Sequence, residues 1–243
     1  MGGRFDPRPL AAKIWADVGY HPEIPRDLLQ PIMETYDLFV VHIPQLSIVR
    51  IGEWLEQHGR PPLSSRPNRR LAGCLIARRG TGIAFIDGTM PLEERRLALA
   101  HELAHFVAHY LEPRRRALHH FGEAIRPVLD GDRQTTVAER LSAILANVPL
   151  GSFEDFLTRE EDPILEGRVA DLEDEADMLA LELLAPQSEV LSQLGRSPCP
   201  IQLAGIFGLP RWAATTWATF IAERQPKNDP FIVALREALK KNS

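Results

Sequence analysis

Residues 97–110 constrain the fold of this chain more than any other segment, because they place polar side chains inside an apolar helix. The segment reads LALAHELAHFVAHY and contains no glycine or proline. Residues four apart lie on one face of a helix, so a single metal ion can bridge the rings of His101 and His105. Glu102 lies about 100° round the same helix. Apolar residues nearly encircle the segment, which predicts that the helix is buried.

Burial makes these side chains chemically informative. Two imidazoles and a carboxyl group need partners inside a core, and a metal ion with a bound water satisfies all three. The spacing His-Glu-x-x-His is that of zinc hydrolases, in which the histidines hold the metal and the glutamate acts on water. The alternative is a chance match on a core helix whose histidines bond to the backbone. The long, buried helical segment favours the metal site.

The composition is that of an ordinary globular protein. The chain has 243 residues, 44% hydrophobic and 25% charged, which is enough for one large domain or two small ones. The net charge of −5 provides no global field that attracts nucleic acid or an anionic membrane. Cys74 and Cys199 are too few for a disulfide framework, and no apolar run approaches the length of a membrane span. We therefore expect a cytoplasmic protein with no membrane partner.

The remaining pattern predicts an α+β fold that is mainly helical. Residues 38–43 have the composition of a short strand, and residues 71–77 and 81–87 form a β-hairpin. We expect this small sheet to pack on the histidine helix, and the edge of the second hairpin strand to be open to an extended peptide. Helices are predicted over residues 10–18, 25–36, 48–58, 136–146 and 153–157, a polar connection over residues 112–116 and 119–120, and a loop over residues 126–134.

A helix over residues 169–184 offers the next metal ligand. Zinc held by two histidines needs a third protein ligand and keeps a position open for water. The carboxylates of this helix adjoin its apolar stripe, with Glu173 close to the buried side and Asp174 further toward solvent. We predict Glu173 as the third ligand and Glu175 as the competing candidate. The alternative is that all these acids form a solvated face.

Two further residues are expected beside the metal. Asp177, one turn after Glu173, can accept the ring N–H of a ligand histidine and fix its tautomer. His109 lies one turn past His105, where a structural or supporting role is favoured over catalysis. Because His109 is at +8 from His101, and not at +10, a third histidine ligand is not expected.

These two segments resemble the ImmA/IrrE family of bacterial and phage metallopeptidases. The likeness lies in Ala-His-Glu-Leu-Ala-His at residues 100–105, with His109 beyond, and in Glu-Asp-Glu-Ala-Asp at residues 173–177 followed by Leu-Leu-Ala-Pro at residues 183–186. The family pattern has its ligand glutamate three residues before an alanine, followed by Asn or Asp, and it closes on Leu-Leu-x-Pro. With the predicted order of elements, the likeness covers roughly residues 20–190.

The resemblance implies a gluzincin-like α+β peptidase. Its metal is zinc, with manganese as the alternative, held by His101, His105 and Glu173, and Glu102 is the catalytic base. The implied substrate is a helix-turn-helix repressor, whose cleavage releases its genes in a stress response or in the regulation of a mobile element. Two other functions stay open. One is a DNA-binding regulator with a structural metal, and the other is a metal- or ligand-sensing protein that releases a partner without cutting it.

We divide the chain into a zinc peptidase domain at residues 1–195 and a C-terminal helical segment at residues 196–243. Within the first, residues from about 112 to 168 form an insertion, because 68 positions separate His105 from Glu173.

The C-terminal segment resembles a helix-turn-helix. Its helical stretches at residues 201–207 and 212–221 are separated by Gly-Leu-Pro. Only Arg211 is basic near the start of the second stretch, so direct nucleic-acid binding is not expected. A final amphipathic helix is predicted over residues 231–241. The aromatic side chains that suit packing better than phosphate contact are Trp212, Trp217 and Phe220.

Overall fold

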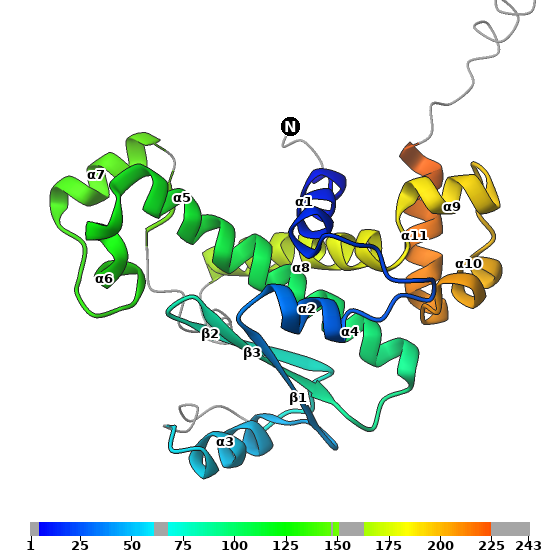
Figure 1. Cartoon of the computed structure of the whole chain (residues 1–243), viewed down its shortest axis with the longest axis horizontal. Coiled ribbons are helices and arrows are strands. Elements are labelled where there is room, and N and C mark those ends of the chain that lie inside the picture. The colour runs from blue at the N-terminus through cyan, green and yellow to red at the C-terminus, as the bar shows by residue number, and fades with distance from the viewer. Residues whose placement is uncertain (1–4, 61–67, 147, 151–162, 225–243) are drawn as a thin grey trace, which may run out of the picture.

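A three-stranded sheet lies at the centre of the fold, with helices on both faces (Figure 1). This computed structural model describes residues 5–60, 68–146, 148–150 and 163–224. The strand order is β1-β3-β2, with β3 parallel to β1 and antiparallel to β2. The expected α+β class, mainly helical, is confirmed. The strands are β1 (Leu38–Ile43), β2 (Gly73–Arg78) and β3 (Thr81–Asp87).

Helices make up most of the described chain. Those before the histidine helix are α1 (Arg8–Val18), α2 (Leu29–Thr35) and α3 (Ile48–Gln57). The helix that carries His101 is α4 (Leu92–Ala104), continued by the π-helix η1 (His105–Leu111) and by α5 (Glu112–Phe121). The others are the short 3₁₀-helix η2 (Glu123–Ile125), α6 (Arg126–Leu129), α7 (Val137–Ala146), α8 (Pro163–Leu184), α9 (Gln187–Leu194), α10 (Pro200–Phe207) and α11 (Arg211–Arg224).

The β2–β3 hairpin turns on Arg79 and Gly80. Their φ angles are 54° and 90°, the left-handed pair of a type I′ turn, whose twist matches that of the flanking strands. The Gly80 backbone N–H donates to the Tyr110 hydroxyl at 2.6 Å. The turn is thereby fixed to the end of the helix that carries the histidines.

The edge strands of the sheet are β1 and β2, so our expectation of an open edge on the second hairpin strand, β3, is wrong. β3 is the central strand, paired on both sides. The neighbour that covers it is β1, whose Leu38 lies opposite Gly82 in the parallel register. This pairing joins segments about 40 residues apart, and local sequence patterns carry no signal for it.

Successive side chains of β3 divide between two hydrophobic clusters. Ala84 and Ile86 belong to the main core with α4 and α8, whereas Phe85 packs with Ile51 and Leu55 of α3. A strand alternates its side chains between faces, so one short strand holds both layers together. The main core also contains Trp217, which shows that the C-terminal helices pack on the same core as the sheet. The division at residue 195 stays a prediction.

Helix α2 is shorter than predicted and turned differently. It begins at Leu29, whose backbone N–H donates to the Asp27 carboxylate at 3.0 Å, and not at Pro25. Its buried residues include Ile32, but Met33, which we expected inside, is 53% exposed. The N-cap residue is Leu28, and the bond between Asp27 and Leu29 is an Asx turn directly before the helix.

Two further sequence expectations between residues 112 and 134 are wrong. The polar connection is helix α5, because Ala117 is buried and Arg114 forms a buried ion pair with Asp130 at 2.5 Å. The loop that we expected at 126–134 begins with the short helix α6, whose Val128 and Leu129 are buried against α5. Residues 153–157 and 231–241, where helices were also predicted, lie outside the described residues.

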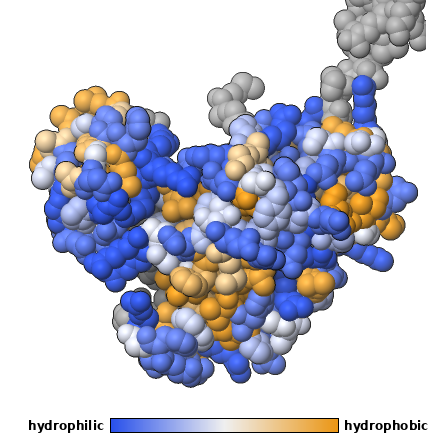
Figure 2. All heavy atoms as spheres, in the orientation of Figure 1, coloured by the Kyte–Doolittle hydropathy of each residue, from blue (hydrophilic) through white to orange (hydrophobic). Residues whose placement is uncertain are grey.

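Helix α7 forms as predicted, but its apolar side faces outward. In Figure 2 it contributes to the hydrophobic surface at the upper left of the molecule. Helical periodicity reveals that the apolar residues share a face, and it does not reveal whether a partner covers that face. The exposed residues are Val137, Leu141, Ile144 and Leu145.

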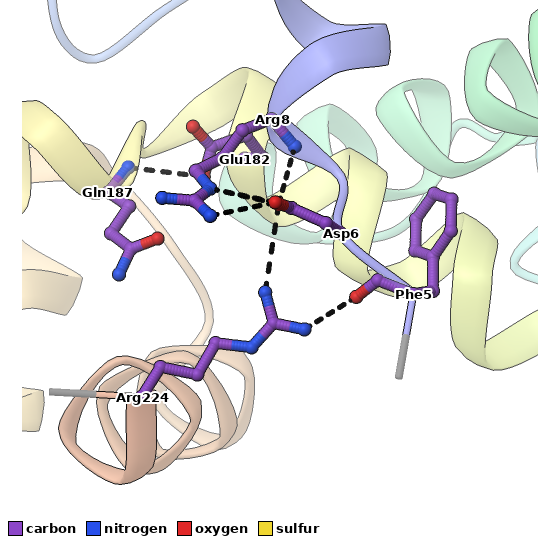
Figure 3. A network of polar contacts seen from close by, with 6 residues as sticks. All are labelled: Phe5, Asp6, Arg8, Glu182, Gln187 and Arg224. Atoms are coloured by element: carbon purple, nitrogen blue, oxygen red, sulfur yellow. Dashed lines mark hydrogen bonds and ion pairs between the residues drawn. The ribbon is translucent and has the colours of Figure 1, made fainter. Parts of the chain in front are cut away.

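A polar network fastens the start of the chain to α11 (Figure 3). Arg224 donates to the Phe5 carbonyl oxygen at 2.6 Å and lies 3.6 Å from Asp6, which also pairs with Arg8 at 2.7 Å. Beside them, Glu182 of α8 accepts the Gln187 backbone N–H at 3.1 Å. Burial raises the pKa of Glu182 to about 7, despite this hydrogen bond and the charge of Arg8.

Replacing Glu182 with Gln tests this burial. The ordinary pKa is 4.5, so wild-type stability falls as pH rises from about 4.5 to 7, where only the unfolded chain ionises freely. Glu182→Gln should therefore be more stable than the wild type at pH 8, by about 3 kcal/mol, and should unfold at a higher temperature there. At pH 4 the variant and the wild type should unfold at the same temperature. Thermal unfolding across this range measures the difference. The exposed control Asp171→Asn should follow the wild-type profile, and an equal gain at both pH values would contradict the assignment.

Candidate metal centre

Helix α4 enters the site directly from the sheet. It begins after Pro91, with Glu93 and Glu94 in its first turn. Acidic groups at this end of a helix interact favourably with the helix dipole. Its apolar residues then bury it, as predicted from the sequence. His101 lies in its last turn, and His105 opens the π-helix η1.

Packing between α4 and α8 brings the second half of the site into place. The contact surface is built from small residues such as Ala100 and Ala104 on α4, and Ala176 and Ala180 on α8, all fully buried. Short side chains allow two helices to approach closely. The carboxylates of α8 therefore reach the histidines of α4.

Three electron-donating atoms converge where these helices meet. The Nε2 atoms of His101 and His105 are 3.0 Å apart, and the Glu173 carboxylate lies 3.2 Å from the first and 3.4 Å from the second. Ligands about 2.0–2.1 Å from a tetrahedral zinc ion are about 3.3 Å apart, so this spacing fits such an ion. Within the described residues, these three form the group that could hold a metal.

Asp177 lies behind His101. Its carboxylate oxygen is 2.8 Å from His101 Nδ1, on the far side of the ring from the converging Nε2. If Nδ1 carries the proton and donates it to Asp177, the Nε2 lone pair is free for a metal. This is the geometry that we predicted for Asp177.

His109 and Glu175 extend a similar chain behind His105. The Nδ1 atoms of His105 and His109 are 3.0 Å apart, and His109 Nε2 lies 3.3 Å from the Glu175 carboxylate. A consistent set of protons has each ring donating outward, toward Glu175, which leaves His105 Nε2 free for a metal. The structure thus places Glu175, our competing ligand, against His109 and away from the three converging atoms.

The charges around the rings differ from those of ordinary histidines. Burial alone would lower the pKa of His101, but hydrogen bonds to Asp177 and Glu173 outweigh it and raise this pKa to about 10. Hydrogen bonds from both histidines hold the pKa of Glu173 well below its usual range. Glu173 is 54% exposed, so our placement of it on the buried side is corrected. It lies at the rim of the site because its helix turns this position toward α4 and solvent.

Glu102 is buried beside the three atoms. Burial raises the pKa of its carboxyl group, although His101 and His105 oppose the shift. A carboxyl group with a raised pKa in a buried site is suited to accept and return a proton. Its side chain packs on Gly73 of β2, and a Cβ atom at that position would overlap the Glu102 carboxyl group.

Gly73 is a site residue that our sequence reasoning missed. No motif marks it, and the signal available was a glycine in a strand, which often indicates close approach by another group. Trp212 is a second site residue that our sequence reasoning missed. We expected it to pack, yet it is 58% exposed and lines a cavity beside His101, whereas Trp217 and Phe220 are buried as predicted.

Zinc binding tests the geometry of the centre. We expect the protein to bind one zinc ion, Glu173→Gln to weaken binding most, and Asp177→Asn to weaken it about 10- to 100-fold by releasing the ring of His101. Competition with a chromophoric zinc chelator measures each affinity. Asp174→Asn, on the exposed side of the same helix, is the matched control. Equal affinities for Asp177→Asn and Asp174→Asn would contradict the predicted role of Asp177.

Comparison with known proteins supports the assignment that the motifs suggested. The family model described as the IrrE N-terminal-like domain, of the M78 peptidases, matches residues 67–170. The match includes His101 of α4 and His105 of η1, and it ends shortly before Glu173 on α8. No curated protein and no solved structure matches the chain. Among the described helices, none is both long and apolar enough to cross a membrane. The chain thus carries an IrrE N-terminal-like domain, and this match agrees with the resemblance to the ImmA/IrrE metallopeptidases that the two motifs indicated.

Proposed function

We propose that the protein is a zinc-dependent endopeptidase whose substrate is a helix-turn-helix transcriptional repressor in the cytoplasm. The observation that carries the proposal is the convergence of His101, His105 and Glu173 at ligand spacing, with Glu102 buried beside them. Zinc suits two imidazoles and a carboxylate, and it binds such ligands more tightly than manganese does. A four-coordinate zinc ion with three protein ligands keeps its fourth position open for water.

The chain's own groups divide the chemistry between them. A zinc ion held by the three ligands would polarise the scissile carbonyl and make a water molecule more acidic. Glu102 accepts a proton from the attacking water and delivers it to the leaving amine nitrogen. Asp177 and the pair formed by His109 and Glu175 keep the ligand rings in the required tautomers.

The edge strand β2 supports peptide binding at this position. Ala72 and Gly73, at the start of β2, line the same cavity as His101 and Glu102. An extended peptide can add to an edge strand through backbone hydrogen bonds, which would carry its scissile bond past the metal ligands. The sheet edge that we first assigned to β3 is thereby replaced by one that adjoins the site.

A protein substrate is favoured over DNA by the surroundings of the C-terminal helices. Helix α11, the second helix of the helix-turn-helix-like pair, buries Trp217 and Ile221 in the main core. The cavity that it borders beyond the metal centre contains four acidic residues and no lysine or arginine. Phosphate groups would be repelled there. The resemblance to the family supports the choice of a repressor.

Removing the carboxylate base tests the proposed activity. We expect Glu102→Gln to bind zinc as the wild type does and to cleave about 10²- to 10⁴-fold more slowly, since general acid–base catalysis contributes that factor. Co-expression with the helix-turn-helix protein of a neighbouring gene, read by immunoblot, measures cleavage. Equal cleavage by wild type and variant, or none by either, counts against the peptidase. Release of the intact repressor would favour the sensing alternative. Retarded mobility of promoter DNA with the isolated protein would favour the DNA-binding alternative.

A methyl group at Gly73 should interfere with Glu102 specifically. Gly73→Ala is expected to displace the carboxyl group and to slow cleavage at least about tenfold, while the zinc ligands keep their places. The cleavage rate and the zinc content of purified protein measure the two effects. Gly52→Ala, on α3 with open space around its Cβ position, is the control. Full activity in Gly73→Ala would show that the contact with Glu102 is unimportant.

A further inference from the structure

A cavity of about 330 Å³ lies directly beside the metal centre. One wall is a single face of α4, on which Glu94, Leu97 and Ala98 lead to His101. Trp212, at the start of α11, and Met90 complete the apolar part of the wall. Because His101 and Glu102 also line this cavity, a side chain bound there belongs to a residue next to the reacting bond.

The wall of this cavity also includes an acidic side chain, that of Glu94. Glu94 makes no hydrogen bond or ion pair with any residue that the structure describes. It is two helical turns before His101, or roughly 10 Å along the axis, so only a long side chain reaches it from the metal centre. A carboxylate in this position favours a ligand that carries a positive charge.

Trp212 supplies the second feature that favours a cation. Its indole ring is 58% exposed at the cavity, although a large aromatic side chain gains from burial. An indole face attracts ammonium and guanidinium groups, most strongly of the aromatic side chains. The apolar stem of lysine or arginine can also pack along Leu97 and Ala98.

The adjoining surface carries the same sign of charge. A second cavity, of about 740 Å³, follows the next turns of α8 and α11, beyond Asp177 and Trp212. It is lined by Asp171, Asp174, Glu175 and Glu223, together with three threonines of α11. Neither cavity has a lysine or arginine among its described lining residues. Both flanks of the metal centre therefore present negative potential to a substrate.

We propose that the cavity beside His101 is a specificity pocket for a lysine or arginine side chain next to the scissile bond. The charged end of that side chain lies between Glu94 and the ring of Trp212, and its stem lies along Leu97 and Ala98. This inference rests on the proposed peptidase function, because the pocket has a specificity role only if a peptide passes the metal ligands. It assigns the C-terminal segment a part in substrate selection.

Peptide binding to a catalytically impaired protein tests the pocket without relying on cleavage. The probes are fluorescein-labelled hexapeptides of alanine with one central arginine, lysine, norleucine or glutamate. Their affinities for zinc-loaded Glu102→Gln protein are measured by fluorescence anisotropy. We expect the arginine and lysine peptides to bind about five- to tenfold more tightly than the norleucine peptide, as one charge-assisted contact provides.

Variants in the same background identify the residues responsible. Glu94→Gln should remove the preference for the basic peptides, and Glu94→Lys should shift it toward the glutamate peptide. Trp212→Leu should weaken binding of the arginine peptide more than binding of the norleucine peptide, because leucine keeps the wall apolar but removes the indole ring. Glu93→Gln, a neighbouring acid outside the cavity, is the matched control and should bind all four peptides as the parent does.

The outcomes separate this pocket from the peptidase function itself. Equal or tighter binding of the norleucine peptide, a basic preference that survives Glu94→Gln, or no binding of any peptide would each overturn the pocket. Cleavage of the repressor by the wild type, measured separately, decides the peptidase function. Circular dichroism of each variant establishes that a loss of binding is not a loss of folding.

Discussion

The central constraint on this fold is the close approach of two imidazole nitrogens and one carboxylate. The Nε2 atoms of His101 and His105 are 3.0 Å apart, and each lies within 3.4 Å of one of the two Glu173 carboxylate oxygens. Lone pairs at such distances repel unless a proton or a cation lies between them. Hydrogen bonds to Asp177 and Glu173 raise the pKa of His101 to about 10, against the effect of burial, so the ring favours a proton. A divalent cation would serve all three atoms at once. The surrounding structure is arranged so that these atoms have no easy way to separate.

That arrangement depends on how α4 and α8 pack. Alanines at the contact bring the two helices close, and the partners behind the ligands, Asp177 and His109, prevent the rings from turning away. The change from α- to π-helix at His105 lies inside this region. Single π turns occur often at functional sites, where they reorient side chains without breaking the helix. Here the change leaves His105 and His109 with their Nδ1 atoms in contact.

The C-terminal helices take part in the same structure. The Trp217 indole donates to the carbonyl oxygen of Ala185, just after α8, at 2.7 Å, and Arg224 ties the end of α11 to the start of the chain. These contacts fix α11 beside α8, and its first residues border the metal centre. A segment that resembles a DNA-binding motif in sequence therefore forms one wall of a cavity here. Fold resemblance alone would have assigned it a different role.

The sequence by itself determined the metal helix, its His-Glu-x-x-His spacing, the strand at residues 38–43 and the hairpin, because local periodicity and turn residues encode these. It also predicted Glu173 and Asp177 as site residues, from a carboxylate beside an apolar helix stripe and from the resemblance to a family motif. Only the tertiary structure decided that β3 is central, that Gly73 lies against Glu102 and that Trp212 faces a cavity. Each of these depends on contacts between segments far apart in the chain. Patterns within one helix or strand show which residues share a face, and the partner of that face is determined by packing.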